Sequence, residues 1–162
     1  MLKELCAAGY RGWAFYLDAD AYVRDPSFDL RQYLERHKDK HLIAATGGVT
    51  NERWEINAGV FLINLGHPDG RRLVDLWHWH YMATPDGALR VARDWDDVQN
   101  DQTRLHEILK ANPELTMHLH VENASFQDQG HGGFVRQVMR CLDMSVEART
   151  LEMRRDIAQL KF

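Results

Sequence analysis

Two carboxylates stand two residues apart where an apolar stretch of the chain ends. Trp13–Leu17 is continuously apolar or aromatic, as in a strand buried on both faces of a sheet, and Asp18 and Asp20 follow it. In open α/β sheets, ligands bind outside the carboxyl ends of the strands. Converging carboxylates repel each other unless a cation lies between them, and hard oxygen ligands favour Mg²⁺ or Mn²⁺. The spacing therefore predicts a divalent-metal site, against the plainer interpretation of a polar turn.

Three later segments carry polar residues in a recognisable order. They are Ile56–Asn64, which reads INAGVFLIN, then Asn100-Asp101-Gln102, and last the glycine-rich QGHGG around His131. With Asp18-Ala19-Asp20, they resemble the DxD motif, the Asn-small-Gly strand ending in Ile-Asn, the DQ element and the late histidine of GT-A glycosyltransferases. The resemblance is nearest to the retaining glycogenin/galactosyltransferase-like and galactosyl/mannosyltransferase-like groups.

The resemblance implies a role for each matching residue. The metal ligands for Mn²⁺ or Mg²⁺ would be Asp18, Asp20 and His131, and the ion would offset charge on a departing nucleoside diphosphate. The substrate contacts would be Asn57, Ala58, Gly59 and Gly132, and the catalytic residues at the reacting sugar would be Asp101 and Gln102. The implied reaction is metal-dependent, retaining transfer of a hexose from a UDP- or GDP-hexose to a saccharide, lipid or protein acceptor.

Two other functions stay open on the sequence. Haloacid-dehalogenase-like phosphatases also place a DxD after a hydrophobic strand, with the first Asp as nucleophile. Here Tyr22 stands where that family has Thr or Val, and its later acidic motif is not evident. A non-catalytic glycosyltransferase remnant is the second alternative. An EF-hand calcium loop is excluded, because Val23 occupies the sixth position from Asp18, where glycine is required.

The segments that must position these residues alternate between helical and extended patterns. Helices are expected in the first nine residues and at 28–38, 68–81, 97–110, 135–142 and 145–160, and strands at 13–17, 41–46, 56–65 and 115–121. The alternation predicts an α/β fold, and the resemblance specifies a GT-A, Rossmann-like mixed sheet with flanking helices. Segments 13–17 and 60–63 are expected as interior strands that bring Asp18 and Asn57 to one end. His118 and His120 should share one strand face.

The composition is that of an ordinary globular protein. The 162 residues correspond to one glycosyltransferase-like domain over 1–162. A net charge of −4 gives no general attraction to nucleic acid or anionic lipid, and no apolar run reaches the length of a membrane span. Two cysteines without a CxxC motif suit a reducing compartment, so a cytoplasmic location is expected.

A GT-A domain places several strands and helices before its DxD, whereas 17 residues precede Asp18 here. The resemblance therefore implies the C-terminal part of a GT-A fold, without the half that binds base and ribose. Such a chain is expected to expose a sheet edge, to self-associate through it and to be a poor catalyst by itself.

Overall fold

The structure of the chain is a computed structural model, which describes residues 1–47, 50, 52–83, 100–123, 126–128, 133–138 and 144–160. Its elements, in chain order, are α1 (Leu2–Ala7), β1 (Trp13–Leu17), β2 (Ala21–Val23), α2 (Leu30–Arg36), β3 (Leu42–Thr46), β4 (Ile56–Asn64), α3 (Pro68–Met82), α5 (Asp101–Ala111), the 3₁₀ turn η2 (Pro113–Thr116), β5 (Leu119–Glu122), β6 (Gln127–Asp128), β7 (Val135–Gln137) and α6 (Val146–Gln159). Over the described residues, no helix has the length and apolar character that crossing a membrane requires.

A mixed sheet of four strands forms the centre of the molecule, in the order β1-β4-β3-β5. Strand β4 is antiparallel to both β1 and β3, and β3 is parallel to β5. Strands β1, β3 and β5 therefore point the same way. Their carboxyl ends and the start of β4 all lie at the same end of the sheet. We call this end the site edge, as distinct from the lateral strands β1 and β5. The expected α/β class, with a mixed sheet and flanking helices, is confirmed.

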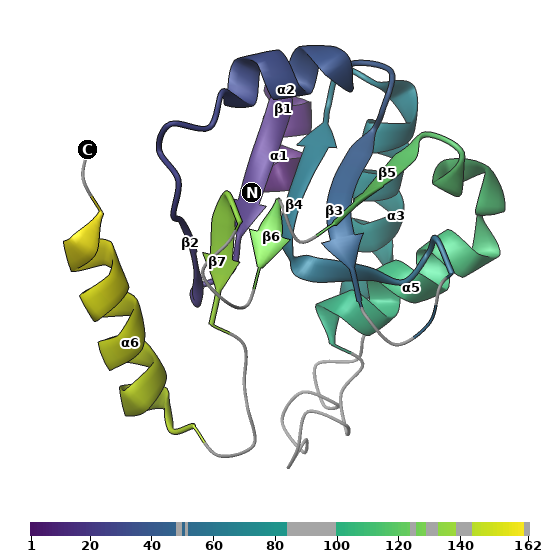
Figure 1. Cartoon of the computed structure of the whole chain (residues 1–162). Coiled ribbons are helices and arrows are strands. Elements are labelled where there is room, and N and C mark those ends of the chain that lie inside the picture. Colours follow the sequence, from purple (N-terminus) through teal and green to yellow (C-terminus); the bar gives the residue numbers. More distant parts are fainter. Residues whose placement is uncertain are drawn as a thin grey trace.

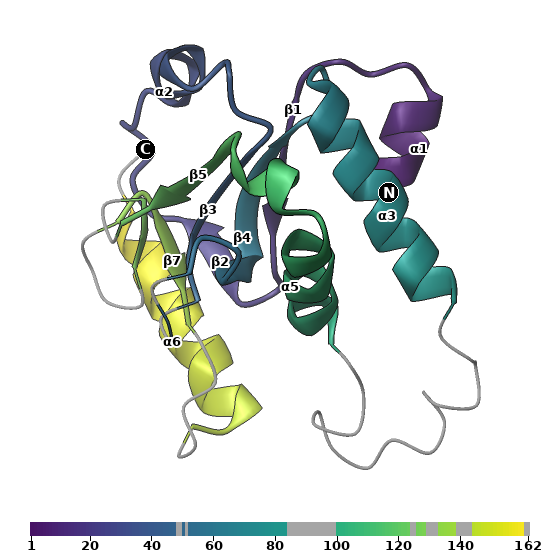
Figure 2. The same ribbon diagram turned by 90° about the vertical axis from the view of Figure 1, so that its right-hand side faces the viewer.

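Helices α3 and α5 lie on one face of this sheet, and α2 with a smaller sheet lies on the other (Figures 1 and 2). A hydrophobic core fills the space on each face. Successive strand residues point to opposite faces, so Leu42 and Ala44 enter one core and Ile43 enters the other. The first core packs against α3 and α5, through Leu73, Leu105, Ile108 and Leu109 among others. The second packs against α2 and a smaller sheet, through Tyr33, Phe126, Phe134 and Val135.

The smaller sheet has the order β2-β7-β6, with β2 antiparallel and β6 parallel to β7. The helix expected at 135–142 is wrong over Val135–Gln137, because these residues form β7 and pair with Ala21–Val23. So short an apolar run has no distinct period, and pairing with a distant strand decides its conformation. Residues 139–143 lie outside the described part.

Strand β1 differs from the expected interior strand. Within the described residues it is the end strand of the large sheet, and all five of its residues are only partly buried. Strand β4 does lie inside the sheet, and the first eight of its nine residues are buried. An apolar run cannot distinguish an edge strand from a central one. The side chains of either strand can be covered by elements that pack on the faces of the sheet.

The strand expected at 115–121 begins later than the sequence indicates. The proline-led turn η2 occupies Pro113–Thr116, and β5 covers Leu119–Glu122. His120 lies in β5, but His118 precedes the strand. The expectation that the two histidines share one strand face is therefore wrong, and each belongs to a different side-chain cluster.

Candidate functional site

The DxD segment is a turn at the site edge that three backbone hydrogen bonds hold. The Asp18 amide donates to the Gly59 carbonyl at 2.8 Å, and the Ala21 amide donates to the Asp18 carbonyl at 3.0 Å. The Val138 amide donates to the Asp20 carbonyl at 2.9 Å. The turn is thus fixed to β4 on one side and to the end of β7 on the other. Asp18 and Asn57 lie at the same end of the sheet, as expected.

The Asn57-Ala58-Gly59 segment at the start of β4 lies directly opposite Asp18. The buried Asn57 side chain accepts from the Gly59 amide at 2.7 Å and donates to Gln137 Oε1 at 3.2 Å. A Cβ added to Gly59 would lie 2.2 Å from Gln137 Nε2 and 2.8 Å from Asp18 Oδ2. A larger residue at this position would therefore have to displace the Gln137 amide or the Asp18 carboxylate.

The DQ element supplies the first residues of α5. Asn100 caps this helix, because its side chain accepts from the Thr103 amide at 2.8 Å. Gln102 Oε1 accepts from the Ala58 amide at 3.1 Å, which joins the helix start to β4. Asp101 accepts from the Gln102 amide at 2.9 Å and lies at the positive end of the helix dipole. Three separate sequence segments are thereby brought to one place.

Electrostatic repulsion is concentrated on Asp18. Burial raises the pKa of Asp18, and the charges of Asp101 and Asp20 raise it further, against a hydrogen bond from Tyr16 that lowers it. That bond runs from the Tyr16 hydroxyl to Asp18 Oδ1 at 2.8 Å, and burial together with this contact raises the pKa of Tyr16. Carboxylates from two motifs thus share one partly desolvated region, where a cation would relieve their repulsion.

Asp20 contacts two residues that no sequence motif points to. Gln137 Nε2 donates to Asp20 Oδ1 at 3.2 Å, and Arg149 Nη1 lies 3.1 Å from Asp20 Oδ2. Gln137 also accepts from Asn57 and from Gln127, so one amide links β4, β6 and the DxD turn. Both residues follow the DxD by more than a hundred positions and belong to no motif. Only the pairing of β2 with β7 brings Gln137 close.

The residues present fit a hard divalent ion in chemistry, but among the described residues Asp18, Asp20 and Asp101 do not form a group of ligand atoms within 4.8 Å of one another. Asp18 offers carboxylate oxygens of the kind that Mg²⁺ and Mn²⁺ prefer, beside the glycine that leaves room for them. Both Asp20 oxygens are engaged by Gln137 and Arg149, so Asp20 must exchange a partner to bind an ion. Two other residues expected at this site, His131 and Gly132, lie outside the described part of the chain.

Arg136, the one basic residue close after His131, is held elsewhere. Its side chain is buried and pairs with Glu152 and Asp156 of α6. Tyr22 donates to the same Asp156 at 2.6 Å. Arg136 therefore attaches α6 to the smaller sheet and is a poor choice for a diphosphate ligand.

A cleft of about 330 Å³ adjoins the acidic residues. Its walls come from α1, β1, β4, α3 and the start of α5, and its lining residues are Met1, Leu2, Lys3, Tyr16, Phe61, Val74, Trp77, His78, Tyr81 and Asp101. Tyr16 joins the cleft to the DxD turn, because its ring lines the wall and its hydroxyl binds Asp18. An aromatic wall with a carboxylate at the side suits a small ligand that carries both apolar and hydroxyl groups.

Comparison with known proteins adds no assignment to this geometry. No protein-family model matches the chain, and none of the curated protein sequences matches it significantly.

Proposed function

We propose that this chain is the metal- and sugar-binding part of a hexosyltransferase that uses a nucleotide-diphosphate sugar, of the GT-A type. One observation carries the proposal: the Asp18–Asp20, Asn57–Gly59 and Asp101–Gln102 segments meet at the site edge. Each of these short motifs occurs by chance in many proteins. Their convergence in space, from segments separated by about forty residues of chain each, is what favours a shared ligand.

The residues of the site divide the work by their chemistry. Asp18 and Asp20 would hold Mn²⁺ or Mg²⁺, which supplies Lewis-acid stabilisation of the leaving diphosphate. Asn57 and Gln102 present amides, which can donate to and accept from sugar hydroxyls. Asp101 places negative charge where positive charge develops on the anomeric carbon during transfer. Gly59 lets the Asp18 carboxylate and the Gln137 amide approach the backbone of β4 closely.

Arg149 gives the site a cationic side chain in addition to the proposed metal ion. In this structure its guanidinium offsets the charge of Asp20. We infer that a metal–diphosphate complex displaces Arg149 from Asp20, since both compete for the same carboxylate. A guanidinium released there can bind a phosphate oxygen, for which its planar donors are well suited.

The cleft beside Tyr16 is the proposed place for the transferred hexose or its acceptor. Tyr16 and Trp77 form an aromatic wall, while Asp101 and His78 offer polar contacts. A pyranose ring has an apolar face and polar edges, so it can pack on an aromatic ring and hydrogen-bond at the same time.

The test is incubation of the chain with UDP- and GDP-hexoses and Mn²⁺, with free hexose and nucleoside diphosphate followed by NMR. Slow hydrolysis that stops with EDTA is expected, with retained configuration in the first-formed sugar. Asp101→Asn should slow it by about tenfold or more, because the developing charge loses its partner. Glu35→Gln, a change at an exposed ion pair with Lys38 in the region of α2, is the matched control and should leave the rate unchanged. Absence of hydrolysis with every sugar nucleotide would contradict the proposal.

A second function is favoured by one specific observation. Arg149 already neutralises the charge of Asp20. This favours a site that binds nucleotide sugars without a metal ion and without turning them over. Metal-independent nucleotide binding without hydrolysis would support this non-catalytic alternative. The phosphatase alternative would instead show a phosphorylated Asp18 by mass spectrometry after incubation with a phosphate ester.

A further inference from the structure

A cluster of histidines lies at the end of the sheet where β3 and β5 begin, opposite the site edge. His67 and Asp69 belong to the start of α3, and His118 immediately precedes β5. These three side chains each offer one ligand atom, and the atoms lie within 4.8 Å of one another. The rings of His67 and His118 are 5.1 Å apart between centroids. Two segments distant in sequence therefore converge on one small volume lined by metal-ligand atoms.

A fourth residue, His41, adds an independent observation. Its side chain is completely buried, and Nδ1 lies 3.1 Å from the His118 carbonyl oxygen. A carbonyl oxygen can only accept, so Nδ1 carries the proton and Nε2 carries a lone pair. That Nε2 is buried and has no hydrogen-bond partner among the described residues. A buried acceptor without a donor is costly, and a bound ion is one of the few things that explain it.

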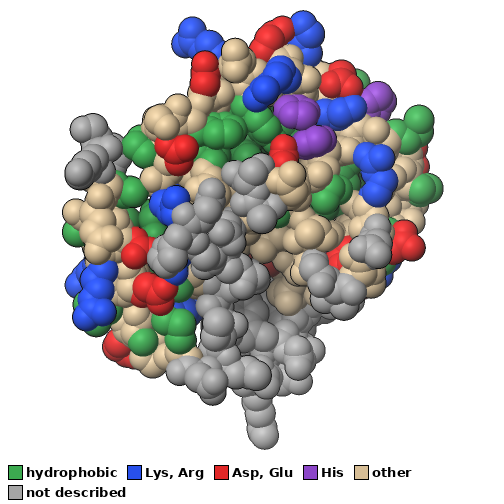
Figure 3. All heavy atoms as spheres, viewed as in Figure 1, with side chains coloured by type: hydrophobic (Ala, Val, Ile, Leu, Met, Phe, Trp, Pro, Cys, Tyr) green, Lys and Arg blue, Asp and Glu red, His purple; other side chains and the backbone are tan. Residues whose placement is uncertain are grey.

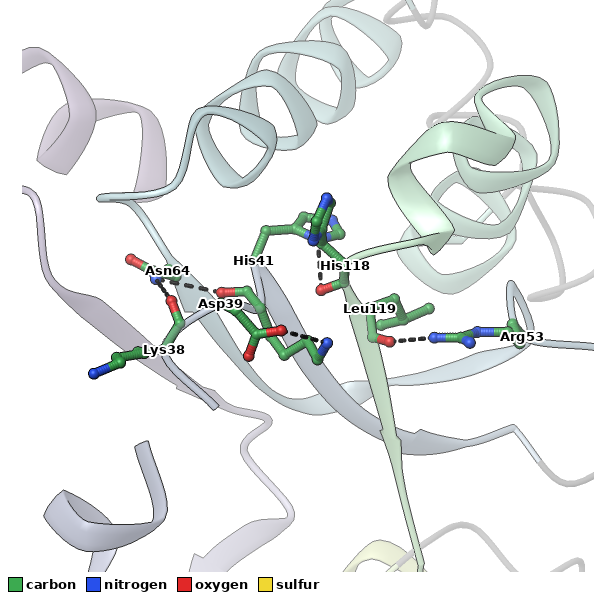
Figure 4. A network of polar contacts seen from close by, with 8 residues as sticks. Lys38, Asp39, His41, Arg53, Asn64, His118 and Leu119 are labelled. Atoms are coloured by element: carbon green, nitrogen blue, oxygen red, sulfur yellow. Dashed lines mark hydrogen bonds and ion pairs between the residues drawn. The ribbon is translucent and has the colours of Figure 1, made fainter. Parts of the chain in front are cut away.

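The backbone of His41 is held in place beside the cluster. Its backbone amide donates to the same His118 carbonyl at 3.0 Å, and its carbonyl accepts from the Asn64 amide at 2.8 Å. Figure 4 shows His41 and His118 at the point where β3 and β5 begin, with the contact between the His41 ring and the His118 backbone carbonyl dashed. The His41 and His67 ring centroids are 6.0 Å apart. Burial lowers the pKa of His41 to about 4, so this ring is neutral at physiological pH.

A second histidine cluster differs in one respect. His37, His120 and Glu122 also lie within reach of one another, in the region of α2 and β5, and histidine side chains are seen gathered on that face (Figure 3). Glu122, however, already accepts from Tyr33 at 2.6 Å and lies 2.9 Å from His120 Nε2. Protein partners account for this carboxylate, whereas they leave the lone pair of His41 unexplained.

We propose that His41, His67, Asp69 and His118 form a binding site for Zn²⁺ or a similar borderline transition-metal ion. Three imidazoles and a carboxylate are a usual ligand set for such ions, and zinc accepts them in tetrahedral geometry. Zinc bonds of about 2.0–2.1 Å require the side chains to move closer together on binding than they are here. The ion links the starts of β3, α3 and β5, so its role is structural.

This site is separate from the proposed hexosyltransferase site and does not depend on it. Asn57 and Asn64 are seven positions apart along β4, which corresponds to about 23 Å of extended chain. The ligand types differ as well, since the site edge offers carboxylates for a hard ion. Zinc binding at the His41 cluster and Mn²⁺ binding at Asp18 can therefore succeed or fail independently.

Metal binding changes the first turn of α3. His67 caps this helix, because its Nδ1 accepts from the Asp69 amide at 3.1 Å. Ligation through Nδ1 takes that lone pair, and ligation through Nε2 requires a proton on Nδ1, so either mode gives up the cap. His67→Asn is consequently a useful variant, since asparagine caps helices well while the imidazole is lost.

The experiment is competition of the full chain with a chromogenic chelator for Zn²⁺, together with visible absorption of the Co²⁺ form. One tightly bound ion per chain is expected, with the intense Co²⁺ bands of a tetrahedral site. His118→Gln and His67→Asn should each weaken zinc binding by about tenfold or more. His120→Gln, in the other cluster, is the matched control and should change the affinity by less than about twofold.

Several outcomes would overturn the assignment. They are zinc affinity unchanged in both His118→Gln and His67→Asn, loss of binding in His120→Gln alone, or weak octahedral Co²⁺ bands in the wild type. If a variant fails to fold, the wild-type Co²⁺ spectrum and a rise in its melting temperature with Zn²⁺ still decide the matter. No rise with saturating Zn²⁺ would contradict binding to the folded state.

Discussion

Asp18 has a charge that the metal-free protein accommodates poorly. Its carboxylate is partly buried and is repelled by Asp101 and Asp20, which together raise its pKa. An acid whose pKa is higher in the folded than in the unfolded state destabilises the fold when ionised. The cost is present above the folded pKa and disappears as the pH falls through it. A carboxylate with this property fits a ligand-binding role better than a stabilising one.

Replacing Asp18 by Asn should therefore stabilise the metal-free chain at neutral pH, by up to about 1 kcal/mol. Asn removes the charge and can still accept from Tyr16. Urea unfolding in EDTA measures the change, with the exposed Asp39→Asn as a control that should stay within about 0.5 kcal/mol of wild type. A less stable Asp18→Asn protein would show that repulsion is not significant at this position.

Helix α5 positions two residues of the candidate site, and its N-cap fixes where they lie. Asn100→Ala removes the bond to the Thr103 amide and should cost about 1 kcal/mol of unfolding free energy. It should also weaken nucleotide binding, because Asp101 and Gln102 start the helix. The control is Asp29→Ala at the cap of α2, which accepts from Gln32 at 2.9 Å. That change should lower stability alike and leave binding intact, and equal effects of both variants on binding would refute the link.

The resemblance leads us to expect self-association through a sheet edge, and β1 is an end strand of the large sheet. Among the described residues, no strand pairs with the side of β1 that faces away from β4. Unpaired strand edges favour pairing with another chain. Sedimentation velocity over a range of concentrations should show reversible self-association, and a monomer at every concentration would argue that the edge is covered.

The elements were predictable from sequence where the hydrophobic pattern is long. Helix α3 and strand β4 lie where expected, because many apolar residues repeat with one period. The short strands β2 and β7 were not anticipated, since three residues define no period and their pairing partners are distant. The position of a strand within the sheet could not be predicted from the sequence either, as the placement of β1 at the side of the sheet shows.

The site was predictable in part for the same reason. Asp18, Asn57 and Asp101 belong to short motifs that follow or begin regular elements, and the sheet brings them together. Gln137 and Arg149 were missed because only tertiary structure places them beside Asp20. His41 was likewise hidden, since its burial and its unpartnered nitrogen depend on the meeting of β3 with the residues before β5.

At the scale of the whole molecule, His41 makes the stability of the metal-free chain depend on pH. An unfolded histidine takes up a proton near pH 6.5, whereas burial lowers the pKa of His41 to about 4 in the folded state. The free energy of unfolding therefore carries no penalty from His41 above pH 6.5. It decreases by roughly 3 kcal/mol as the pH falls from there toward 4. Urea unfolding in EDTA across this range should show the loss, with a shallower slope in His41→Gln. Equal slopes would contradict the assignment to His41.

Dependence of nucleotide binding on both a metal and Asp18 is the central claim for the molecule. Calorimetric titration of the whole chain with UDP and with GDP, in Mn²⁺ and in EDTA, tests it in wild type and in Asp18→Asn. Mn²⁺ should strengthen binding of at least one nucleotide by about tenfold or more in wild type, because the diphosphate and Asp18 share the ion. The enhancement should vanish in Asp18→Asn. Equal affinity with and without Mn²⁺, or an enhancement that persists in Asp18→Asn, would contradict the proposed site.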